Sequence, residues 1–299
     1  MKDNPLVSLC ILSYNQQDYI ADAINGALSQ TYDNLEIVIS DDCSTDDTFS
    51  VAEKLVKDYK GPHKLILNRN EKNIGIMAHF NKVVYQLANG DFITTTGGDD
   101  VSMPGRIQET MDFLLKNPQV VSCHFGSLQV DESLKEIKTK NDEISKGLTS
   151  IITIGDYIYT NILFWLFSGD SRTFRREVIQ KFPPLSVSHN EDYPMFMRCL
   201  IVGPTAIIRK PLVWHRMHQN NESEKLRFKQ EGKDLFRQIG KDLDYAFDNK
   251  YLTEREYKAL KRKVKKVHLG MMLIDITRLF PFVKKFYISL RSALVRISS

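Results

Sequence analysis

The chain has 299 residues, of which 42% are hydrophobic and 26% are charged. This composition is typical of a folded globular protein with one large domain and an extension, or with two modest domains, and it excludes a disordered or fibrous chain. The net charge of +4 hides an asymmetry, because residues 222–299 carry 19 Lys and Arg against 10 Asp and Glu, whereas the preceding residues carry 22 against 27. The basic segment could meet nucleic acid or an anionic membrane surface, and the acidic part would need a cation to hold a phosphate ligand.

The four cysteines are widely spaced, which predicts neither a zinc cluster nor a disulfide framework and favours a reducing compartment. The N-terminal sequence MKDNPLVSLC lacks the pattern of a secretory signal peptide. No apolar run reaches the ~20 residues that a membrane-spanning helix needs. We therefore expect a cytoplasmic protein.

Short apolar runs alternate with helical patterns in the first part of the chain. Leu6–Leu12, Leu35–Ile39 and Leu65–Leu67 predict buried strands, and apolar residues at helical spacing predict a helix after each of them. Asp18 is expected to be the N-cap of the first of these helices. The alternation predicts an α/β fold with a mostly parallel sheet, whose ligands bind at the carboxyl ends of the strands.

The segment DFITTTGGDDVSMPGR at residues 91–106 predicts a fourth strand that stops at a pair of glycines. Asp99 and Asp100 follow directly, and Pro104 is expected in the first turn of the next helix. Adjacent carboxylates at the end of a strand favour binding of a hard divalent cation. The alternative is that one of the two acids only caps the helix.

Acids also follow the second predicted strand, in the sequence SDDCSTDD at residues 40–47. Asp42 lies nearest the tip of this strand. Asp46 and Asp47 are expected in the first turn of the next helix, where the helix dipole favours negative charge. After the third strand, the sequence Asn73-Ile74-Gly75 predicts a turn.

The alternation becomes irregular after the helix that ends near residue 116. Val120–Val130, Arg172–Phe174 and Ile207–Trp214 predict strands, and Asp131–Lys138 resembles the turn of a β-ribbon. The aromatic segment Ile151–Phe167 is typical of a core, although its Tyr and Trp side chains could also form a platform for a sugar.

Two further polar clusters follow. Glu191 and Asp192 precede a helix predicted over Met195–Val202, so capping is the alternative to a catalytic role. In the sequence HRMHQNN, His215 and His218 are three residues apart but are not expected on a helix, so their spacing alone does not predict a two-histidine metal site. A contribution from one histidine is favoured.

The chain is predicted to be helical from Ser223 to its end. Thr253 and Glu256 have the form of a capping box before the second long helix. After a break at Pro281, a basic amphipathic helix could pack on its own domain, on a second subunit of a homodimer, or in a membrane interface.

Four stretches together resemble the inverting nucleotide-sugar glycosyltransferases of family 2, which have the GT-A fold. They are VSLCILSYNQQDYIADAINGALSQTYDNLEIVISDDCSTDDT, the TGGDD turn, NEDY and HRMHQNN. The resemblance covers about residues 5–221 and implies a Rossmann-like, mostly parallel sheet flanked by helices. We expect a GT-A domain over residues 1–221, with a nucleotide-binding half at 1–117 and an acceptor-binding half at 118–221, followed by a basic helical extension at 222–299.

The resemblance also implies roles for single residues. Those that it places against the donor nucleotide are Tyr14, Asn15, Asp42, Asn73 and Asp99. Among them, Asp42 would hydrogen-bond the uracil ring and Asp99 would lie beside the ribose or the sugar. Asp100 would bind Mn²⁺ or Mg²⁺, and His218 would lie near the metal and the diphosphate. Asp192 matches the catalytic base.

The implied reaction moves a hexose or N-acetylhexosamine from a UDP-sugar to a hydroxyl of a saccharide acceptor, with inversion. Bacterial relatives commonly build surface polysaccharides such as O-antigen or capsule on a polyprenyl diphosphate lipid. The basic C-terminal helix could therefore hold the protein on the inner face of the cytoplasmic membrane. The sequence departs from the commonest family pattern at Gly97, where many relatives carry the first acid of the metal-binding motif.

A non-catalytic nucleotide-sugar-binding protein of the same fold is the main alternative, although it would not need Asp192. A nicotinamide-dependent dehydrogenase is disfavoured because the first strand is followed by Ser13-Tyr14-Asn15 and not by a G-x-G-x-x-G loop. Nucleic-acid binding is disfavoured because the basic tail lacks interleaved aromatic residues or a known module. The donor sugars differ by single hydroxyl or amide groups, which the sequence does not distinguish.

Overall fold

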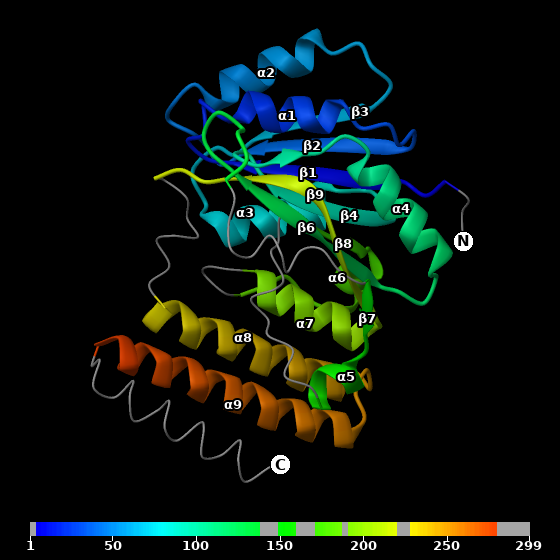
Figure 1. Ribbon diagram of the computed structural model, residues 1–299, viewed down its shortest axis with the longest axis vertical. Coiled ribbons are helices and arrows are strands. Elements are labelled where there is room, and N and C mark those ends of the chain that lie inside the picture. Colours follow the sequence, from blue (N-terminus) through cyan, green and yellow to red (C-terminus); the bar gives the residue numbers. More distant parts are fainter. Residues whose placement is uncertain (1–3, 138–148, 160–170, 187–190, 220–227, 280–299) are drawn as a thin grey trace. The chain divides into compact units, whose positions relative to one another are not determined.

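The structure is a computed structural model that describes residues 4–137, 149–159, 171–186, 191–219 and 228–279. The chain divides into two compact units, Met1–Glu224 and Lys225–Ser299. The first unit contains one nine-stranded sheet, in which the strands lie in the order β3-β2-β1-β4-β8-β6-β9-β5 and β7 pairs with β9 (Figure 1). The predicted α/β fold is confirmed, whereas the binding roles of its two halves stay a prediction.

Four parallel strands form the first half of the sheet. They are β1 (Val7–Ser13), β2 (Leu35–Asp41), β3 (Lys64–Arg69) and β4 (Phe92–Gly97). All residues of β2 and nearly all of β1 and β4 are buried, as expected of strands that are covered on both faces. The apolar runs in the sequence therefore predicted these strands correctly.

The second half of the sheet mixes strand directions. β8 (Arg172–Arg175) runs antiparallel between β4 and β6 (Ser122–Val130), and β9 (Thr205–Arg216) runs parallel to β6. The short strands β5 (Val101–Ser102) and β7 (Ser150–Ile152) pair antiparallel with β9. The strands β1, β2, β3, β4, β6 and β9 consequently all end at the same edge of the sheet, and β8 begins there.

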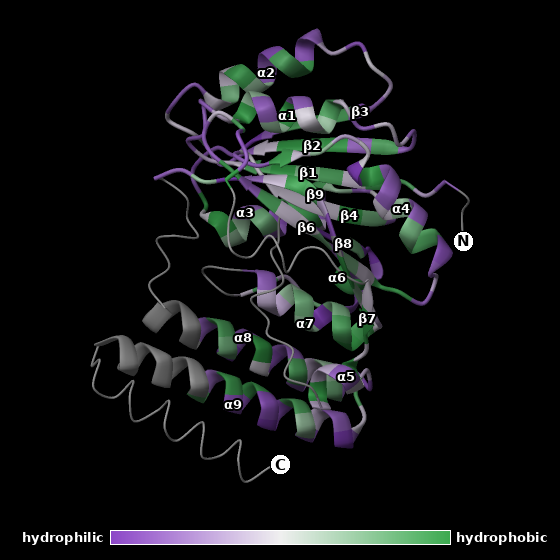
Figure 2. Cartoon of the chain, in the orientation of Figure 1, coloured by the Kyte–Doolittle hydropathy of each residue, from purple (hydrophilic) through white to green (hydrophobic). Residues whose placement is uncertain are grey.

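Helices cover both faces of this sheet. On one face lie α1 (Ile20–Leu28), α2 (Thr48–Asp58) and α4 (Arg106–Lys116). On the other face lie α3 (Ile76–Lys82), a π-helical turn η1 (Val83–Leu87), α6 (Glu177–Lys181) and α7 (Asp192–Val202), while α5 (Ile154–Tyr159) follows β7. In Figure 2 the strands β1 and β2 are mostly green, whereas the helices show both green and purple residues.

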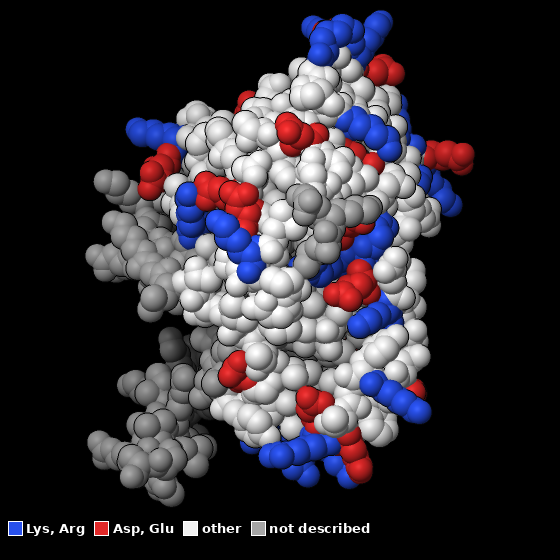
Figure 3. Space-filling model, turned by 90° about the vertical axis from the view of Figure 1, so that its right-hand side faces the viewer, with Lys and Arg blue, Asp and Glu red and all other residues white. Residues whose placement is uncertain are grey.

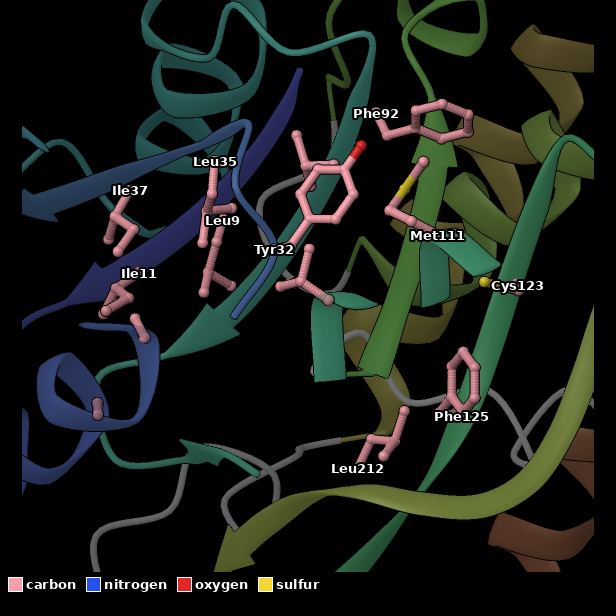
Figure 4. Close-up of a cluster of buried hydrophobic side chains, with 14 of the residues drawn as sticks. Leu9, Ile11, Tyr32, Leu35, Ile37, Phe92, Met111, Cys123, Phe125 and Leu212 are labelled. Carbon is pink, nitrogen blue, oxygen red and sulfur yellow. The ribbon is translucent and has the colours of Figure 1, made fainter. Parts of the chain in front are cut away.

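The core on the first face joins residues that are far apart in the sequence. Leu9 and Ile11 of β1 lie beside Leu35 and Ile37 of β2, and Met111 of α4 is part of the same buried cluster (Figure 4). The alternate residue Cys10 belongs to the core on the opposite face. This alternation follows from the strand geometry, in which successive side chains point to opposite faces.

Two helix starts differ from the prediction. The N-cap of α1 is Tyr19 and not Asp18, because the carbonyl of Gln16 accepts hydrogen bonds from the N–H groups of both Tyr19 and Ile20. The acids at residues 46–47 precede the first turn of α2 and do not lie within it. Hydrogen bonds of local backbone turns therefore determine where these helices begin. The capping preference of single acids did not predict the correct starting residues.

The helix after β4 also begins later than predicted. Pro104 lies in a turn before α4, and the helix begins at Arg106 after Gly105, whose φ of +77° is in the left-handed region. The short strand β5 occupies part of the interval between the diaspartate and the helix. It consists of two residues and pairs with β9 from a distant part of the chain, so the local sequence did not predict it.

The predicted β-ribbon turn is confirmed as far as the described residues reach. Val130 and Glu136 form an antiparallel bridge, and the carboxylate of Asp131 accepts hydrogen bonds from the backbone N–H groups of Ser133 and Lys135. The hydrogen bond from the Ser133 hydroxyl at 2.7 Å, together with these backbone hydrogen bonds, lowers the pKa of Asp131. All four cysteines are free, which agrees with the predicted absence of a disulfide framework.

The second unit contains two long helices, α8 (Phe228–Asp248) and α9 (Glu254–Leu279). The predicted capping box is confirmed, since the Thr253 N–H donates to the Glu256 carboxylate at 2.9 Å and the Glu256 N–H donates to Thr253 Oγ1 at 3.3 Å. The carboxylate of Asp244 joins the helices by accepting a hydrogen bond from the Tyr257 hydroxyl at 2.6 Å. Among the helices of the described segments, none combines the length and the apolar character needed to cross a bilayer.

Glu36 is a buried acid whose hydrogen-bond partners come from three other parts of the chain. Glu36 of β2 is fully buried and accepts hydrogen bonds from Ser8 Oγ at 2.6 Å, from the Asn89 N–H and from Lys64 Nζ. Burial alone would raise the pKa of Glu36, but the hydrogen bonds from Ser8, Asn89 and Lys64 bring it below its ordinary value of 4.5.

We expect the Glu36→Gln substitution to lower the free energy of unfolding at pH 7 by about 1–3 kcal/mol, because charge-assisted hydrogen bonds are lost in a buried position. Since the folded-state pKa is depressed, the stability from the carboxylate is present above pH 4.5 and is lost as the pH falls through the folded-state pKa. Urea unfolding of both proteins at pH 7 and at lower pH measures this difference. A difference that stayed constant down to pH 3 would contradict the expectation.

Candidate functional site

The sequence-predicted polar residues gather at the edge where the parallel strands end. Tyr14 and Asn15 follow β1, Asp42 follows β2, and Asp99 and Asp100 follow β4. His215 lies next to the last residue of strand β9, and His218 follows that strand. The strand pairing therefore brings these parts of the chain to one edge.

The loops after β1 and β2 are joined by hydrogen bonds. Asn15 adopts a φ of 52°, and its side-chain carbonyl accepts a hydrogen bond from the Thr45 N–H at 2.9 Å. The Asn15 N–H in turn donates to Ser44 Oγ at 2.9 Å. Tyr14 is 43% exposed, so its ring is available to a ligand at this edge.

Asp42 is only 2% exposed, and hydrogen-bond donors hold its orientation. Its carboxylate accepts from the Asn70 amide at 2.7 Å and from the N–H groups of Ile74 at 3.0 Å and Gly75 at 2.9 Å. The Asn73 side chain accepts a second contact from the Gly75 N–H at 2.9 Å. The carboxylate of Asp42 therefore fixes the turn at residues 73–75, which brings two predicted nucleotide-site residues together.

A buried histidine lies beneath this loop. His79 Nε2 is 2.7 Å from Ser40 Oγ, and burial lowers the pKa of His79 although the nearby carboxylates of Asp42 and Asp41 act in the opposite direction. The neutral imidazole thus fills a polar position beneath the strand tip without adding a charge there.

The diaspartate does not cap a helix. Because α4 begins only at Arg106, neither Asp99 nor Asp100 lies next to its N-terminus, and the capping alternative is wrong for both acids. Each carboxylate instead faces a histidine: Asp99 Oδ2 is 3.0 Å from His218 Nε2, and Asp100 Oδ1 is 3.1 Å from His215 Nδ1. Both histidines come from the end of β9, and both contribute to the cluster.

Arg216, which lies between these histidines in the sequence, was not among the predicted site residues. Arg216 is 1% exposed, and its Nε donates to the Asp99 carbonyl at 3.0 Å while its Nη2 donates to the Asp22 carboxylate at 2.7 Å. Its Nη1 donates to the Glu132 carbonyl, and its backbone N–H donates to Asp100 Oδ1 at 3.1 Å. The only signal in the sequence was its place in the HRMH cluster, and the interaction with α1 could not be predicted locally.

The glycines before the diaspartate leave room for neighbouring side chains. A Cβ atom at Gly97 would lie 2.5 Å from Asp99 Oδ1, and one at Gly98 would lie 2.9 Å from Ser13 Cβ. At Gly97, where many relatives of the resembling family carry an acid, the Asp99 carboxylate thus fills the adjoining space. Because Gly98 has no Cβ, the end of β4 can lie close to Ser13 at the end of β1.

Asp192 is the first residue of α7, and its side chain is 34% exposed. Glu191 is the N-cap residue but makes no side-chain capping hydrogen bond, so the capping alternative is wrong for Glu191. Both acids instead face Arg172 of β8, which lies beside β4 in the sheet. The same buried guanidinium therefore attracts both carboxylates, through Nη2 for Glu191 and Nη1 for Asp192.

The aromatic segment gives a divided result. Tyr157 is buried and its hydroxyl hydrogen-bonds that of Tyr193, which agrees with a role in the core, and burial raises the pKa of Tyr157 to about 12. Tyr159 is 71% exposed, whereas Trp165 lies outside the described residues.

The donor atoms at the edge suit a hard divalent cation only in part. Carboxylate oxygens from Asp99 and Asp100 are the appropriate type of ligand, and an imidazole from His218 lies next to them. However, no group of three or more His, Cys, Asp or Glu in the described segments is arranged to hold a metal ion by itself. A cation held by these side chains would need further ligands to complete its coordination.

Comparison with known families identifies the chain. The model of the family described as "Glycosyl transferase family 2" matches residues 8–182, more than half of the chain, and spans the loops after β1, β2 and β4. The chain belongs to glycosyl transferase family 2.

One curated family 2 relative is the "Putative colanic acid biosynthesis glycosyl transferase WcaA" of Escherichia coli, which is 34% identical over 125 residues. The aligned part covers 42% of this chain and 42% of WcaA, so the chain matches less than half of that relative's length.

Two solved structures show that this family 2 protein has the GT-A fold. Staphylococcus aureus TarS 1-349, in complex with UDP-GlcNAc, matches with a TM-score of 0.61 at 18% identity over 80% of this chain and 66% of that one. The mannosyltransferase PcManGT from Pyrobaculum calidifontis, in complex with GDP-Man and Mn²⁺, matches with a TM-score of 0.55 at 15% identity over 98% and 81% of the two chains. The predicted fold is confirmed, whereas the roles of the site residues stay predictions.

We expect Arg216→Gln to lower the free energy of unfolding of this family 2 protein by about 2–3 kcal/mol, because a buried charged donor is lost from three separate segments. Arg237→Gln is the matched control, since Arg237 pairs with Asp234 at 2.8 Å but is 67% exposed. Its effect should stay within about 0.5 kcal/mol. Urea unfolding monitored by circular dichroism measures the free energy of unfolding of both variants. Equal losses would contradict the proposal that Arg216 stabilises the fold by joining three segments.

Proposed function

We propose that this protein is an inverting glycosyltransferase that moves a hexose or N-acetylhexosamine from a UDP-sugar to a hydroxyl of a saccharide acceptor. The observation that carries the proposal is the gathering at one sheet edge of the acids after β2 and β4 with the histidines of β9, and of Asp192 through its contact with β8. A nucleoside diphosphate sugar has a base, a diphosphate and a sugar, and each of these side chains could bind one of these groups.

The nucleotide occupies the side of the edge formed by the loops after β1 and β2. Asp42 faces the uracil ring, and Tyr14, Asn15 and Asn73 border the nucleotide. Support comes from the rigid hydrogen bonding of Asp42 to the turn at residues 73–75, which presents a fixed acceptor to a base. TarS, whose complex contains UDP-GlcNAc, has the same fold.

The diphosphate and sugar lie against the ends of β4 and β9. Asp99 lies beside the ribose or the sugar, and Asp100 with His218 would hold Mn²⁺ or Mg²⁺, which when bound would stabilise negative charge on the departing diphosphate. The carboxylates and imidazoles, 3.0–3.1 Å apart in pairs, support this assignment. PcManGT, whose complex contains Mn²⁺, has the same fold.

Asp192 is the general base in this proposal. Its carboxylate takes the proton of the acceptor hydroxyl while the oxygen attacks the anomeric carbon on the face opposite to the diphosphate. One displacement of this kind inverts the anomeric configuration. The partial exposure of Asp192 at the start of α7 supports the role, because an acceptor can reach the carboxylate from solvent.

The acceptor is a growing surface polysaccharide on a polyprenyl diphosphate lipid, and the basic helical extension holds the protein on the inner face of the bacterial cytoplasmic membrane. WcaA, named for colanic acid biosynthesis, supports the polysaccharide context. Arg262, Lys265 and Lys266 of α9 are exposed, which supports attraction to anionic lipids. On the face shown in Figure 3, basic side chains are interspersed with acidic ones, which suits a nucleic acid poorly.

A panel of UDP-glucose, UDP-galactose and their N-acetyl forms tests the catalytic proposal. We expect release of UDP from at least one donor in the presence of Mn²⁺ or Mg²⁺ and its loss in EDTA. Asp100→Asn should lose the metal-dependent rate, and Asp192→Asn should lower the transfer rate about 10²- to 10⁴-fold while still binding UDP.

Asp112→Asn is the matched control for both variants, because Asp112 is an exposed acid on α4 outside the site. It should keep the wild-type rate. UDP binding without turnover of any donor would favour a non-catalytic binding protein, and full activity of Asp192→Asn would exclude its role as the base.

Removal of the residues after Pro281 tests the membrane proposal. We expect the truncated protein to lose binding to vesicles that contain phosphatidylglycerol, because the removed segment is basic, while donor hydrolysis continues. Co-sedimentation with these vesicles, and with neutral phosphatidylcholine vesicles as the control, measures the effect. Equal binding of the full and truncated proteins would refute the proposal.

A further inference from the structure

Arg172 carries a charge into the middle of the first unit. It is the first residue of β8, which pairs with β4 on one side and with β6 on the other, and its side chain is fully buried. A buried cation is costly unless carboxylates or hydrogen-bond acceptors compensate it. The partners of Arg172 therefore indicate what the charge is for.

The guanidinium of Arg172 faces the two acids at the start of α7. Its Nη1 donates a hydrogen bond to the Asp192 carbonyl at 3.1 Å and lies 3.8 Å from Asp192 Oδ1. Its Nη2 lies 3.9 Å from Glu191 Oε1. Within the described part of the chain, Nε and Nη2 make no hydrogen bond. The two carboxylates are thus the nearby opposite charges that the structure gives to this cation.

We propose that Arg172 is a positioning residue, which holds the carboxylate of Asp192 in place for proton transfer. The inference rests on the proposed function, in which Asp192 is the general base. Glu191 and Asp192 are adjacent, so their like charges repel each other, and the permanent charge between them offsets that repulsion. The hydrogen bond to the Asp192 carbonyl fixes the backbone of the base at the same time.

The anchor of Arg172 is rigid because it belongs to the sheet. The Arg172 carbonyl accepts a hydrogen bond from Thr94 Oγ1 of β4 at 2.9 Å, and Thr94 Oγ1 in turn accepts one from the buried Arg106 side chain at 2.8 Å. β4 ends at the diaspartate. The position of Asp192 is therefore tied through Arg172 and Thr94 to the strand that presents Asp99 and Asp100, which would keep the base at a fixed distance from the donor.

The exposed fractions of the three side chains agree with a positioning role for Arg172 and a catalytic role for Asp192. The Arg172 side chain is 0% exposed, whereas those of Glu191 and Asp192 are 19% and 34% exposed. The cation lies behind the acids, and the more exposed of the two is the one that the proposal places against the acceptor. A fixed position of the Asp192 carboxylate matters for catalysis, because a displacement of about 1 Å can cost a factor of about 10² in rate.

The test compares variants at Arg172 in the transfer reaction. We expect Arg172→Met and Arg172→Ala to lower kcat about 10- to 100-fold with KM for the UDP-sugar changed less than about twofold, because the nucleotide site is left intact. Arg172→Lys, which retains the charge but not the planar fork, should keep more activity than Arg172→Met. Guanidinium ion at tens of millimolar should restore part of kcat to Arg172→Ala by filling the space of the lost group.

Arg198→Ala is the matched control. Arg198 is as deeply buried and lies on α7, but its guanidinium donates to the Tyr85 hydroxyl at 2.9 Å and the Pro183 carbonyl at 2.8 Å, away from both acids. Its loss should lower stability without a kcat defect that guanidinium reverses. Circular dichroism at the assay temperature confirms that each variant is folded.

The outcomes separate this inference from the proposed function. If Asp192→Asn is inactive but Arg172→Met keeps the wild-type kcat, the positioning role is wrong although the base assignment stands. A kcat loss that Arg198→Ala shares, and that neither lysine nor guanidinium reverses at residue 172, would also overturn the inference. If Asp192→Asn remains fully active, the proposed base fails regardless of Arg172.

Discussion

Parallel strand pairing is the constraint on which the site depends. Because β1, β2 and β4 run in the same direction, the loops that follow them lie at one edge, and their polar groups gather there although they are far apart in the sequence. The same pairing concentrates acids there, and that concentration would be repulsive without fixed counter-charges. The buried arginines of β8 and β9 supply positive charge and the histidines of β9 contact Asp99 and Asp100, so the second half of the sheet completes an edge that the first half begins.

One acid and two pairs of acids at this edge have three different kinds of partner. Asp42 is held by neutral N–H donors, which fix its direction and suit recognition of a base. Asp99 and Asp100 face imidazoles, which can themselves bind metals. Glu191 and Asp192 face the buried guanidinium of Arg172. Each of these groups of carboxylates thus has a different kind of local environment.

Much of the first half of the fold could be predicted from the sequence, because its strands are continuous apolar runs and are paired with neighbours in regular βα order. The starts of α1 and α4 could not, since the backbone carbonyl of Gln16 and the left-handed Gly105 determine them. The carboxylates at the strand ends were recognisable as a class of site. Their partners were not: Arg172 and Arg216 resemble ordinary strand arginines in the sequence, and only the pairing of distant strands brings them to the acids.

The antiparallel strand β8 explains how Asp192 comes to lie at an edge formed by parallel strands. A strand in the common direction would begin at the far edge and could present only its last residues to the site. β8 instead begins at the site, so its first residue, Arg172, lies beside the end of β4 and in contact with Asp192 at the start of α7. Reversal of one strand thus lets an edge formed by the ends of parallel strands also hold the acids at the start of α7.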